Sequence, residues 1–203
     1  MKIQLAVDRV SIEHAVDIIK EAEPFIDIIE IGTSLFKDFG LQSLKEIRKQ
    51  FQHPILADIK TMDEAEYEFR QIFKNGGDIA TVMGASAIET IRICQRVSQE
   101  YNKDYMIDTL EINDEKMNQL KEFEDAIICL HLPKDKAGDL QSFIRDFMET
   151  YHLTNKIAVA GGVKLEDIPL FKELGIEIVI IGSSITKSED INESAEKFKE
   201  LVR

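Results

Sequence analysis

The stretch PILADIKTMDEAEYEFRQIFKNGGDIATVMG, residues 54–84, contains the unit from which this chain is built. Its first part, PILADIK, is the kind of apolar run that is typical of a strand buried on both faces. A helical pattern, DEAEYEFRQIFKNG, follows and ends at Gly76 and Gly77, where the backbone can leave a helix. DIATVMG then has the pattern of a second strand. Strand, helix and strand in this order predict two parallel strands joined by a helix.

The same unit recurs along the whole chain. The other predicted strands are IQLAVD, IDIIEIG, DYMIDTLE, DAIICLH, KIAVAGG and IEIVIIGSS. The predicted helices cover residues 11–23, 41–50, 63–76, 86–100, 114–123, 138–151, 164–174 and 190–202, with Ser11 as the cap of the first. Eight such units predict a (β/α)8 TIM barrel, and the 203 residues are close to the lower limit of roughly 200 for that fold. We therefore expect residues 1–203 to form a single α/β barrel domain.

An open, doubly wound sheet is the competing fold. Such a sheet normally carries a glycine-rich turn after its first strand. Here that turn is DRVS, residues 8–11, which contains no glycine. The missing glycines favour the barrel.

The net charge, the cysteines and the lengths of the apolar runs indicate which classes of protein are disfavoured. A net charge of -13 and a pI near 4.8 disfavour nucleic acid and anionic membrane surfaces as partners, and solubility is the simplest reading of the acidity. Cys94 and Cys129 both lie in apolar runs, so we expect reduced core residues rather than a disulfide or a metal pair. The N-terminus lacks the pattern of a signal peptide, and no apolar run is long enough to span a bilayer. These features predict a soluble cytoplasmic protein.

Ionisable residues stand at the ends of most predicted strands. In TIM barrels the active site lies at the C-terminal ends of the strands. The ionisable residues at those ends are Asp8, Glu30, Asp58, Lys60, Asp108 and His131. Any one of them alone would more often be a helix cap, a solvated loop residue or a core histidine. The barrel would gather all of them at one face, and the set therefore predicts an active site.

Two of these acids suit a metal ion. Glu30 and Asp58 end adjacent strands, and their hard oxygen atoms fit Mg²⁺, which usually takes one or two carboxylates plus water and substrate oxygens. Lys60 follows Asp58 by two residues and so lies on the same side of the strand. Its ammonium group could stabilise a developing enolate or alkoxide. The alternative is an ion-pair cluster that only closes the barrel mouth, but this leaves His131 and the glycine loops unexplained.

The last two strands end in glycine turns. The sequences VAGGV and IIGSS place Gly161, Gly162, Gly182 and Ser183 in these loops, where backbone N–H groups can approach an anion closely. The loops after strands seven and eight are the usual phosphate site of this fold. The four residues therefore predict a phosphate site, and two ordinary turns are the alternative.

The chain also resembles a known superfamily. The D-x-K-x-x-D pattern of Asp58, Lys60 and Asp63 is similar to that of the orotidine-monophosphate decarboxylase superfamily. IIEIGT, with Glu30, resembles its metal-dependent branch, 3-hexulose-6-phosphate synthase and 3-keto-L-gulonate-6-phosphate decarboxylase. IQLAVD, GGDIATVMG and KIAVAGGVK are similar to this branch as well, so the resemblance spans the whole chain.

The resemblance implies a role for each candidate residue. Glu30 and Asp58 would hold Mg²⁺, and Lys60 would lie beside the metal and the substrate hydroxyls. Asp8 would bind substrate, and Asp63 would reach into the partner's site of a homodimer. The remaining roles are His131 at the enediolate and Gly161, Gly162, Gly182 and Ser183 at the phosphate. Both activities pass through a Mg²⁺-bound enediolate of a pentulose phosphate, which the synthase adds to formaldehyde and the decarboxylase forms by losing CO2.

Five positions are informative when the chain is compared with the two activities. Asp108 and Ala160 resemble the synthase pattern, in which a carbon–carbon lyase of the aldolase type joins formaldehyde and ribulose 5-phosphate. Lys134, a candidate substrate-binding residue, stands where the decarboxylase has arginine and keeps only the charge. Pro133 and a shortened loop depart from the synthase, and Ser183 stands where many members have glycine or arginine. The synthase is the favoured interpretation, and the decarboxylase is the alternative.

Two further interpretations stay open. The chain could be a non-catalytic paralogue that binds a sugar phosphate, with the changed loop after His131 as its sign. It could also be an unrelated phosphate-binding barrel such as a pentulose-phosphate epimerase. That enzyme would need histidine zinc ligands at several strand ends, and only His131 is available.

Overall fold

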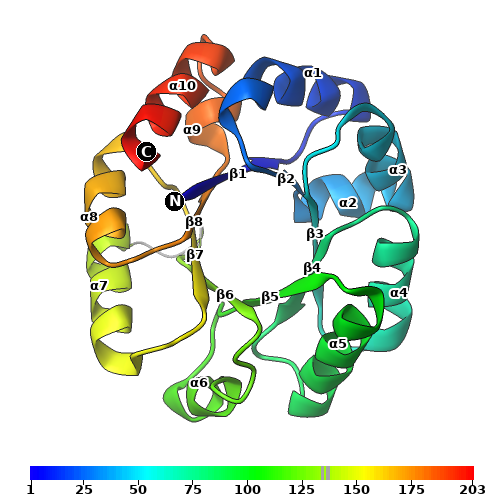
Figure 1. Cartoon of the computed structure of the whole chain (residues 1–203), viewed down its shortest axis with the longest axis vertical. Coiled ribbons are helices and arrows are strands. Elements are labelled where there is room, and N and C mark those ends of the chain that lie inside the picture. The colour runs from blue at the N-terminus through cyan, green and yellow to red at the C-terminus, as the bar shows by residue number, and fades with distance from the viewer. Residues whose placement is uncertain (134, 136–137) are drawn as a thin grey trace.

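Eight parallel strands close into a barrel in chain order (Figure 1). The structure is a computed structural model that describes residues 1–133, 135 and 138–203. The strands are β1 (Lys2–Val7), β2 (Ile28–Ile31), β3 (Ile55–Thr61), β4 (Ile79–Met83), β5 (Asp104–Asp108), β6 (Ile127–His131), β7 (Lys156–Ala160) and β8 (Ile178–Ile181). β1 pairs with both β2 and β8, which closes the barrel and excludes the open sheet. The predicted (β/α)8 fold is confirmed.

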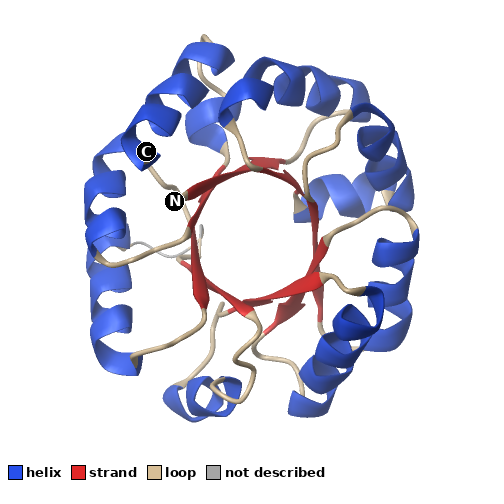
Figure 2. Cartoon of the chain, viewed as in Figure 1, coloured by secondary structure: helices blue, strands red, loops and turns tan. Residues whose placement is uncertain are grey.

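The helices form a ring around the strands (Figure 2). They are α1 (Ile12–Ala22), α2 (Thr33–Phe39), α3 (Leu41–Gln50), α4 (Ala65–Lys74), α5 (Ile88–Tyr101), α6 (Asp114–Leu120), α7 (Leu140–Tyr151), α8 (Ile168–Glu173), α9 (Ser183–Thr186) and α10 (Ile191–Val202), with 3-10 turns η1 (Glu23–Phe25) and η2 (Leu165–Asp167). Within the described parts of the chain, none of these helices is both long enough and apolar enough to cross a membrane.

Most helix boundaries lie close to those expected, with three differences. The Ser11 hydroxyl accepts a hydrogen bond from the His14 backbone N–H at 3.2 Å, which confirms it as the cap of α1. The short helices α2 and α9 were not expected from the sequence pattern. α4 begins at Ala65 rather than at Asp63, because Glu64 takes a left-handed conformation with φ of 54°. Asp63 therefore belongs to the loop before the helix.

The barrel interior is packed with side chains below its C-terminal mouth. The buried apolar side chains there are Ile28, Leu56, Ile79, Met106, Ile127, Cys129, Ala158, Ala160, Ile178 and Ile180. A larger apolar layer fills the space between strands and helices and contains Cys94. Both cysteines are free and buried, as expected. The apolar side chains of the interior fill the barrel below the mouth, where the strands end.

Acidic residues also occupy the opposite end of the barrel, where they serve the fold. Asp27 accepts a hydrogen bond from the Ile3 backbone N–H at 2.8 Å and pairs with Lys199 at 2.9 Å. Asp78 accepts one from the Ile55 backbone N–H at 2.9 Å and pairs with Arg48 and Lys103, each at 2.5 Å. Each acid therefore ties the N-terminal end of its strand to a neighbouring strand and to a helix or loop cation.

Candidate active site

A cavity of about 850 Å³ lies at the C-terminal mouth of the barrel. The predicted site residues that line it are Asp8, Glu30, Asp58, Lys60, His131, Gly161, Gly162, Gly182 and Ser183. Asp108 lies beneath the lining and contacts two of its members. Asp63 is exposed and is not among the described residues that line the cavity. Lys134 lies outside the described residues.

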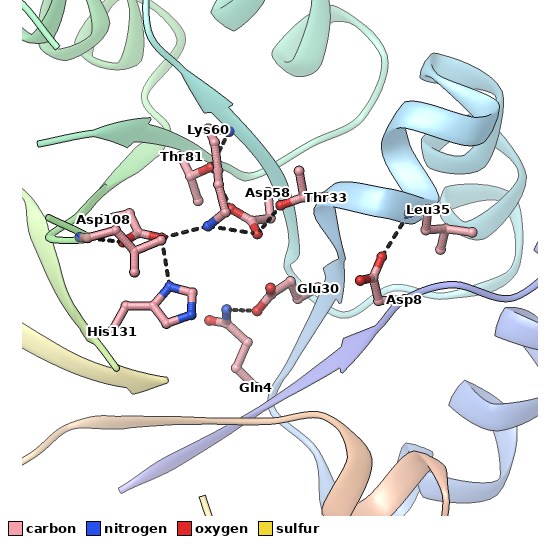
Figure 3. A network of polar contacts seen from close by, with 11 residues as sticks. Gln4, Asp8, Glu30, Thr33, Leu35, Asp58, Lys60, Thr81, Asp108 and His131 are labelled. Carbon is pink, nitrogen blue, oxygen red and sulfur yellow. Dashed lines mark hydrogen bonds and ion pairs between the residues drawn. The ribbon is translucent and has the colours of Figure 1, made fainter. Parts of the chain in front are cut away.

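Lys60 is the centre of a polar network at the mouth (Figure 3). Its Nζ lies 2.6 Å from Oδ2 of Asp108 and 3.2 Å from Oδ2 of Asp58. Nδ1 of His131 lies 2.9 Å from the same Oδ2 of Asp108. The network therefore joins β3, β5 and β6 through one lysine and two carboxylates.

Threonine hydroxyl groups fix the carboxylate of Asp58. Thr33 donates a hydrogen bond to Oδ2 at 2.6 Å, and Thr81 donates one to Oδ1 at 2.9 Å. The Thr81 hydroxyl also accepts a hydrogen bond from the Lys60 backbone N–H at 2.9 Å. Thr33 and Thr81 stood near strand ends in the sequence, but nothing in the pattern showed that they bind Asp58.

The backbone at Lys60 departs from a regular strand. Its φ is +50°, a left-handed conformation that is unfavourable for a residue with a side chain. The pairing register between β3 and β4 also shifts between Ala57 and Thr61. Lys60 does reach the cavity with Asp58, as predicted, but through this irregularity rather than through simple alternation along the strand.

The contacts within the network favour the charged forms of Lys60 and Asp108. Burial lowers the pKa of Lys60, but the carboxylates of Asp58 and Asp108 outweigh this effect and raise that pKa above its usual value. Burial raises the pKa of Asp108, but the hydrogen bond from His131 and the charge of Lys60 leave it below its usual value. Lys60 is therefore a permanent cation that can stabilise negative charge and cannot act as a base at neutral pH.

Glu30 has a different environment. Its side chain is buried, and among the described residues its one hydrogen-bond partner is Gln4, whose Nε2 donates to Oε2 at 2.5 Å. Burial and the neighbouring charge of Asp58 together raise the pKa of Glu30 to about 8. The positive charge of Lys60 lowers this pKa but does not offset the two effects that raise it, and a bound cation would supply further positive charge.

The donor set at Glu30 and Asp58 fits Mg²⁺. Mg²⁺ needs only one or two carboxylates and takes its other ligands from water and substrate. In the described chain no group of three or more histidine, cysteine or acidic side chains is arranged to hold a metal. A magnesium site here would therefore rest on these two carboxylates, and the ion remains a prediction.

The glycine loops approach their neighbours closely. Gly161 has φ of +109°, and a Cβ atom there would lie 2.4 Å from the Leu132 carbonyl oxygen, so a side chain does not fit. The Ser184 hydroxyl donates a hydrogen bond to the Val163 carbonyl at 2.7 Å and ties the two loops together. Gly182 directly precedes α9, whose first residue is Ser183. All four predicted phosphate residues of these loops line the cavity, and the phosphate site itself stays a prediction.

Asp8 has a structural contact as well as a place in the cavity. Its Oδ1 accepts a hydrogen bond from the Leu35 backbone N–H at 2.8 Å, in the first turn of α2. A Cβ atom at Gly32 would lie 2.7 Å from the Asp8 side chain, so glycine permits this approach. The other oxygen, Oδ2, lies 3.5 Å from Nε of Arg9. Asp8 therefore anchors α2 at the edge of the site.

The sequence reasoning missed three residues of the site. Arg9 and Lys187 line the cavity near the glycine loops. Arg9 follows Asp8 directly, so its place at a strand end was a usable signal, whereas Lys187 follows the unexpected helix α9. Gln4 lies within β1, two residues before Ala6 and on the inward side of the strand. A polar side chain at an inward position of a strand was the signal in the sequence that could have identified Gln4.

The raised pKa of Glu30 predicts how stability depends on pH. Up to about pH 8 the folded, metal-free protein holds a proton on Glu30 that the unfolded chain releases near pH 4.5. The free energy of unfolding should therefore fall, relative to Glu30→Gln, as pH rises from 4.5 to 8. Urea unfolding of both proteins with EDTA across this range measures the difference. A difference that stays constant would contradict the buried, protonated Glu30.

Comparisons with known proteins extend over the full chain. A family model described as Orotidine 5'-phosphate decarboxylase / HUMPS family matches residues 1–198. The chain is 34% identical over 209 residues to 3-hexulose-6-phosphate synthase of Bacillus subtilis (strain 168), covering 100% of this chain and 99% of that protein. It is 28% identical over 207 residues to the protein of the same name in Staphylococcus haemolyticus (strain JCSC1435), with the same coverage.

Solved structures show the same likeness. The structure of 3-hexulose-6-phosphate synthase from Salmonella typhimurium has a TM-score of 0.94 and 29% identity, covering 100% of this chain and 98% of that one. The structure of KGPDC from Streptococcus mutans has a TM-score of 0.88 and covers 99% of this chain and 96% of that one. At 18% identity, the second likeness shows the fold alone.

Proposed function

The chain belongs to the Orotidine 5'-phosphate decarboxylase / HUMPS family, and from this premise we propose that it is a Mg²⁺-dependent 3-hexulose-6-phosphate synthase. Such an enzyme is an aldolase, a carbon–carbon lyase that joins formaldehyde and ribulose 5-phosphate. The single observation that carries the proposal is the Lys60 ammonium held between Asp58 and Asp108, beside the buried carboxylate of Glu30. The full-length identity of 34% to a protein named as a synthase supports this choice within the family.

The substrate would bind at the carboxylates and the lysine. Glu30 and Asp58 would hold Mg²⁺, which when bound supplies a Lewis acid that stabilises negative charge on substrate oxygens. Lys60 adds a fixed positive charge where an enediolate oxygen develops. Because the network already orients the Lys60 ammonium, little reorganisation is needed during the reaction.

His131 is the group that moves the proton. Asp108 is ionised and can only accept hydrogen bonds, so Nδ1 of His131 carries the hydrogen that it shares with Asp108. Nε2 is then free to take a proton from C1 of ribulose 5-phosphate. The electron pair left on C1 attacks the formaldehyde carbon, and the resulting alkoxide takes up the proton. In this scheme Asp108 orients both His131 and Lys60.

The opposite side of the cavity would bind the phosphate group. Backbone N–H groups around Gly161, Gly162, Gly182 and Ser183 supply neutral donors there. The side chains of Arg9 and Lys187, which line the same cavity, supply positive charge. Their charges suit a phosphate dianion and support a sugar phosphate as the substrate.

The proposed enzyme is a homodimer with shared sites. Asp63 is exposed beside Met62, which is 53% exposed, and near Tyr67, which is 66% exposed. Methionine and tyrosine are enriched at protein–protein interfaces, so the exposure of these two side chains supports an interface here. Asp63 would cross that interface and enter the cavity of the second subunit.

A parallel assay with Mg²⁺ tests the reaction. One sample contains ribulose 5-phosphate and formaldehyde, and formaldehyde loss is recorded; the other contains 3-keto-L-gulonate 6-phosphate, and CO2 release is recorded. We expect formaldehyde loss to dominate and EDTA to abolish it. Dominant CO2 release would make the chain a decarboxylase. If neither formaldehyde loss nor CO2 release is detected, the result would favour another sugar phosphate as the substrate, or a non-catalytic paralogue.

A further inference from the structure

The side chain of Gln4 is polar in an apolar place. It is fully buried inside the barrel, and its β1 position pairs with Ile28 of β2 and Ile180 of β8. Apolar side chains, among them Ile28, Ile178 and Ile180, fill this part of the interior. A buried amide costs free energy unless hydrogen bonds replace the water that it loses.

In the described chain, the nitrogen of this amide has a hydrogen-bond partner and its oxygen has none. Nε2 donates to Oε2 of Glu30 at 2.5 Å, whereas Oε1 is buried and has no partner among the described residues. Figure 3 shows the nitrogen directed at the Glu30 carboxylate and the oxygen on the side of the His131 ring. An apolar side chain of the same size would avoid the unpaired oxygen, so packing alone does not explain a glutamine here.

We propose that Gln4 is a positioning residue. Its amide nitrogen holds Oε2 of Glu30, which leaves Oε1 of Glu30 to bind the metal ion. This inference rests on the proposed Mg²⁺ site at Glu30 and Asp58. A glutamate side chain has three rotatable bonds, and Glu30 has no other hydrogen-bond partner in the described chain to hold its carboxylate. Partners behind a metal ligand commonly set its orientation and hence its affinity for the metal.

The contact also explains an asymmetry between the two carboxylates. Asp58 is held by two threonine hydroxyls and by the ammonium of Lys60. Among the described residues, Glu30 receives one hydrogen bond, from Gln4 in the filled part of the barrel. Without Gln4, the Glu30 carboxylate would lose the one hydrogen bond that the described residues give it, and with it a fixed orientation.

Metal binding without substrate tests the assignment. Mn²⁺ is the probe, because it prefers the same octahedral oxygen ligands as Mg²⁺ and its free ion gives an EPR signal that binding removes. The variants are Gln4→Leu and Gln4→Met, which keep the size of the side chain and remove the amide. Met106→Leu is the matched control, a volume-conserving change at a fully buried position of the same interior.

We expect both Gln4 variants to bind Mn²⁺ about 10-fold more weakly or worse than the wild type. Both variants should stay folded without metal, as circular dichroism checks, and Met106→Leu should bind Mn²⁺ normally. Unchanged Mn²⁺ affinity in the Gln4 variants would overturn the positioning role of Gln4. The proposed metal site at Glu30 and Asp58 would not be affected by that result. No binding by the wild type would overturn the metal site and the inference together. Loss of the fold in both variants would show that the amide serves the core, which also overturns the inference.

Discussion

Lys60→Ala is expected to lower kcat by about 100- to 1,000-fold, the loss that follows removal of one preorganised charge from a developing oxyanion. The ammonium lies within 3.2 Å of two carboxylates that are largely buried. Its removal takes away the positive charge opposite the enediolate and leaves Asp58 and Asp108 to repel it. Steady-state kinetics with Mg²⁺, ribulose 5-phosphate and formaldehyde measure the change, and circular dichroism checks the fold.

Lys103→Ala is the matched control for this experiment. Lys103 also pairs with an aspartate, Asp78, at 2.5 Å, but at the opposite end of the barrel. We expect this variant to keep its kcat and to lose only stability. If Lys60→Ala changes KM and leaves kcat intact, Lys60 binds the substrate equally in ground and transition states, and its assigned role is wrong.

Mixing two inactive variants is expected to restore activity. Asp63→Ala and Lys60→Ala should each be inactive, because each lacks one part of the proposed shared site. In a mixed dimer, one site combines the intact Lys60 of one subunit with the intact Asp63 of the other. Random exchange of a symmetric dimer would return about a quarter of the wild-type activity per subunit. The measurement is specific activity after the mixture has been incubated at low protein concentration.

The position of Asp63 is the reason for this expectation. In the single chain it is exposed and lies away from the cavity, in the loop that precedes α4. Sedimentation should show a dimer for each variant and for the mixture. Mixed dimers without activity would mean that Asp63 acts in its own subunit or does not take part in catalysis. An Asp63→Ala variant with normal activity would mean that Asp63 takes no part in catalysis.

The barrel could be predicted from the sequence because its unit repeats without interruption. Residues 54–84 already showed a strand, a helix and a strand, and the fold follows from eight copies of that pattern. The same logic located Asp58, Asp108 and His131, because strand ends meet at one face. The structure brings these three side chains together around Lys60.

The contacts that orient the site could not be predicted in the same way. Pattern gives the face on which Thr81 and Gln4 lie, but not which carboxylate each one binds. The left-handed backbone of Lys60 and Glu64 has no signal in residue types, since both residues disfavour it. These conformations are set by tertiary packing, which one-dimensional periodicity does not contain.

The two ends of the barrel carry separate sets of charged residues. Asp27 and Asp78 tie strands together at one end, whereas Asp58 and Asp108 hold the lysine at the other. Substitutions that are far apart and share no partners act almost independently. Substitutions at the mouth can therefore change the chemistry in evolution without disturbing the contacts that hold the strands together at the other end. For a protein engineer, the same separation marks where new substrates can be sought and where thermal durability should be improved.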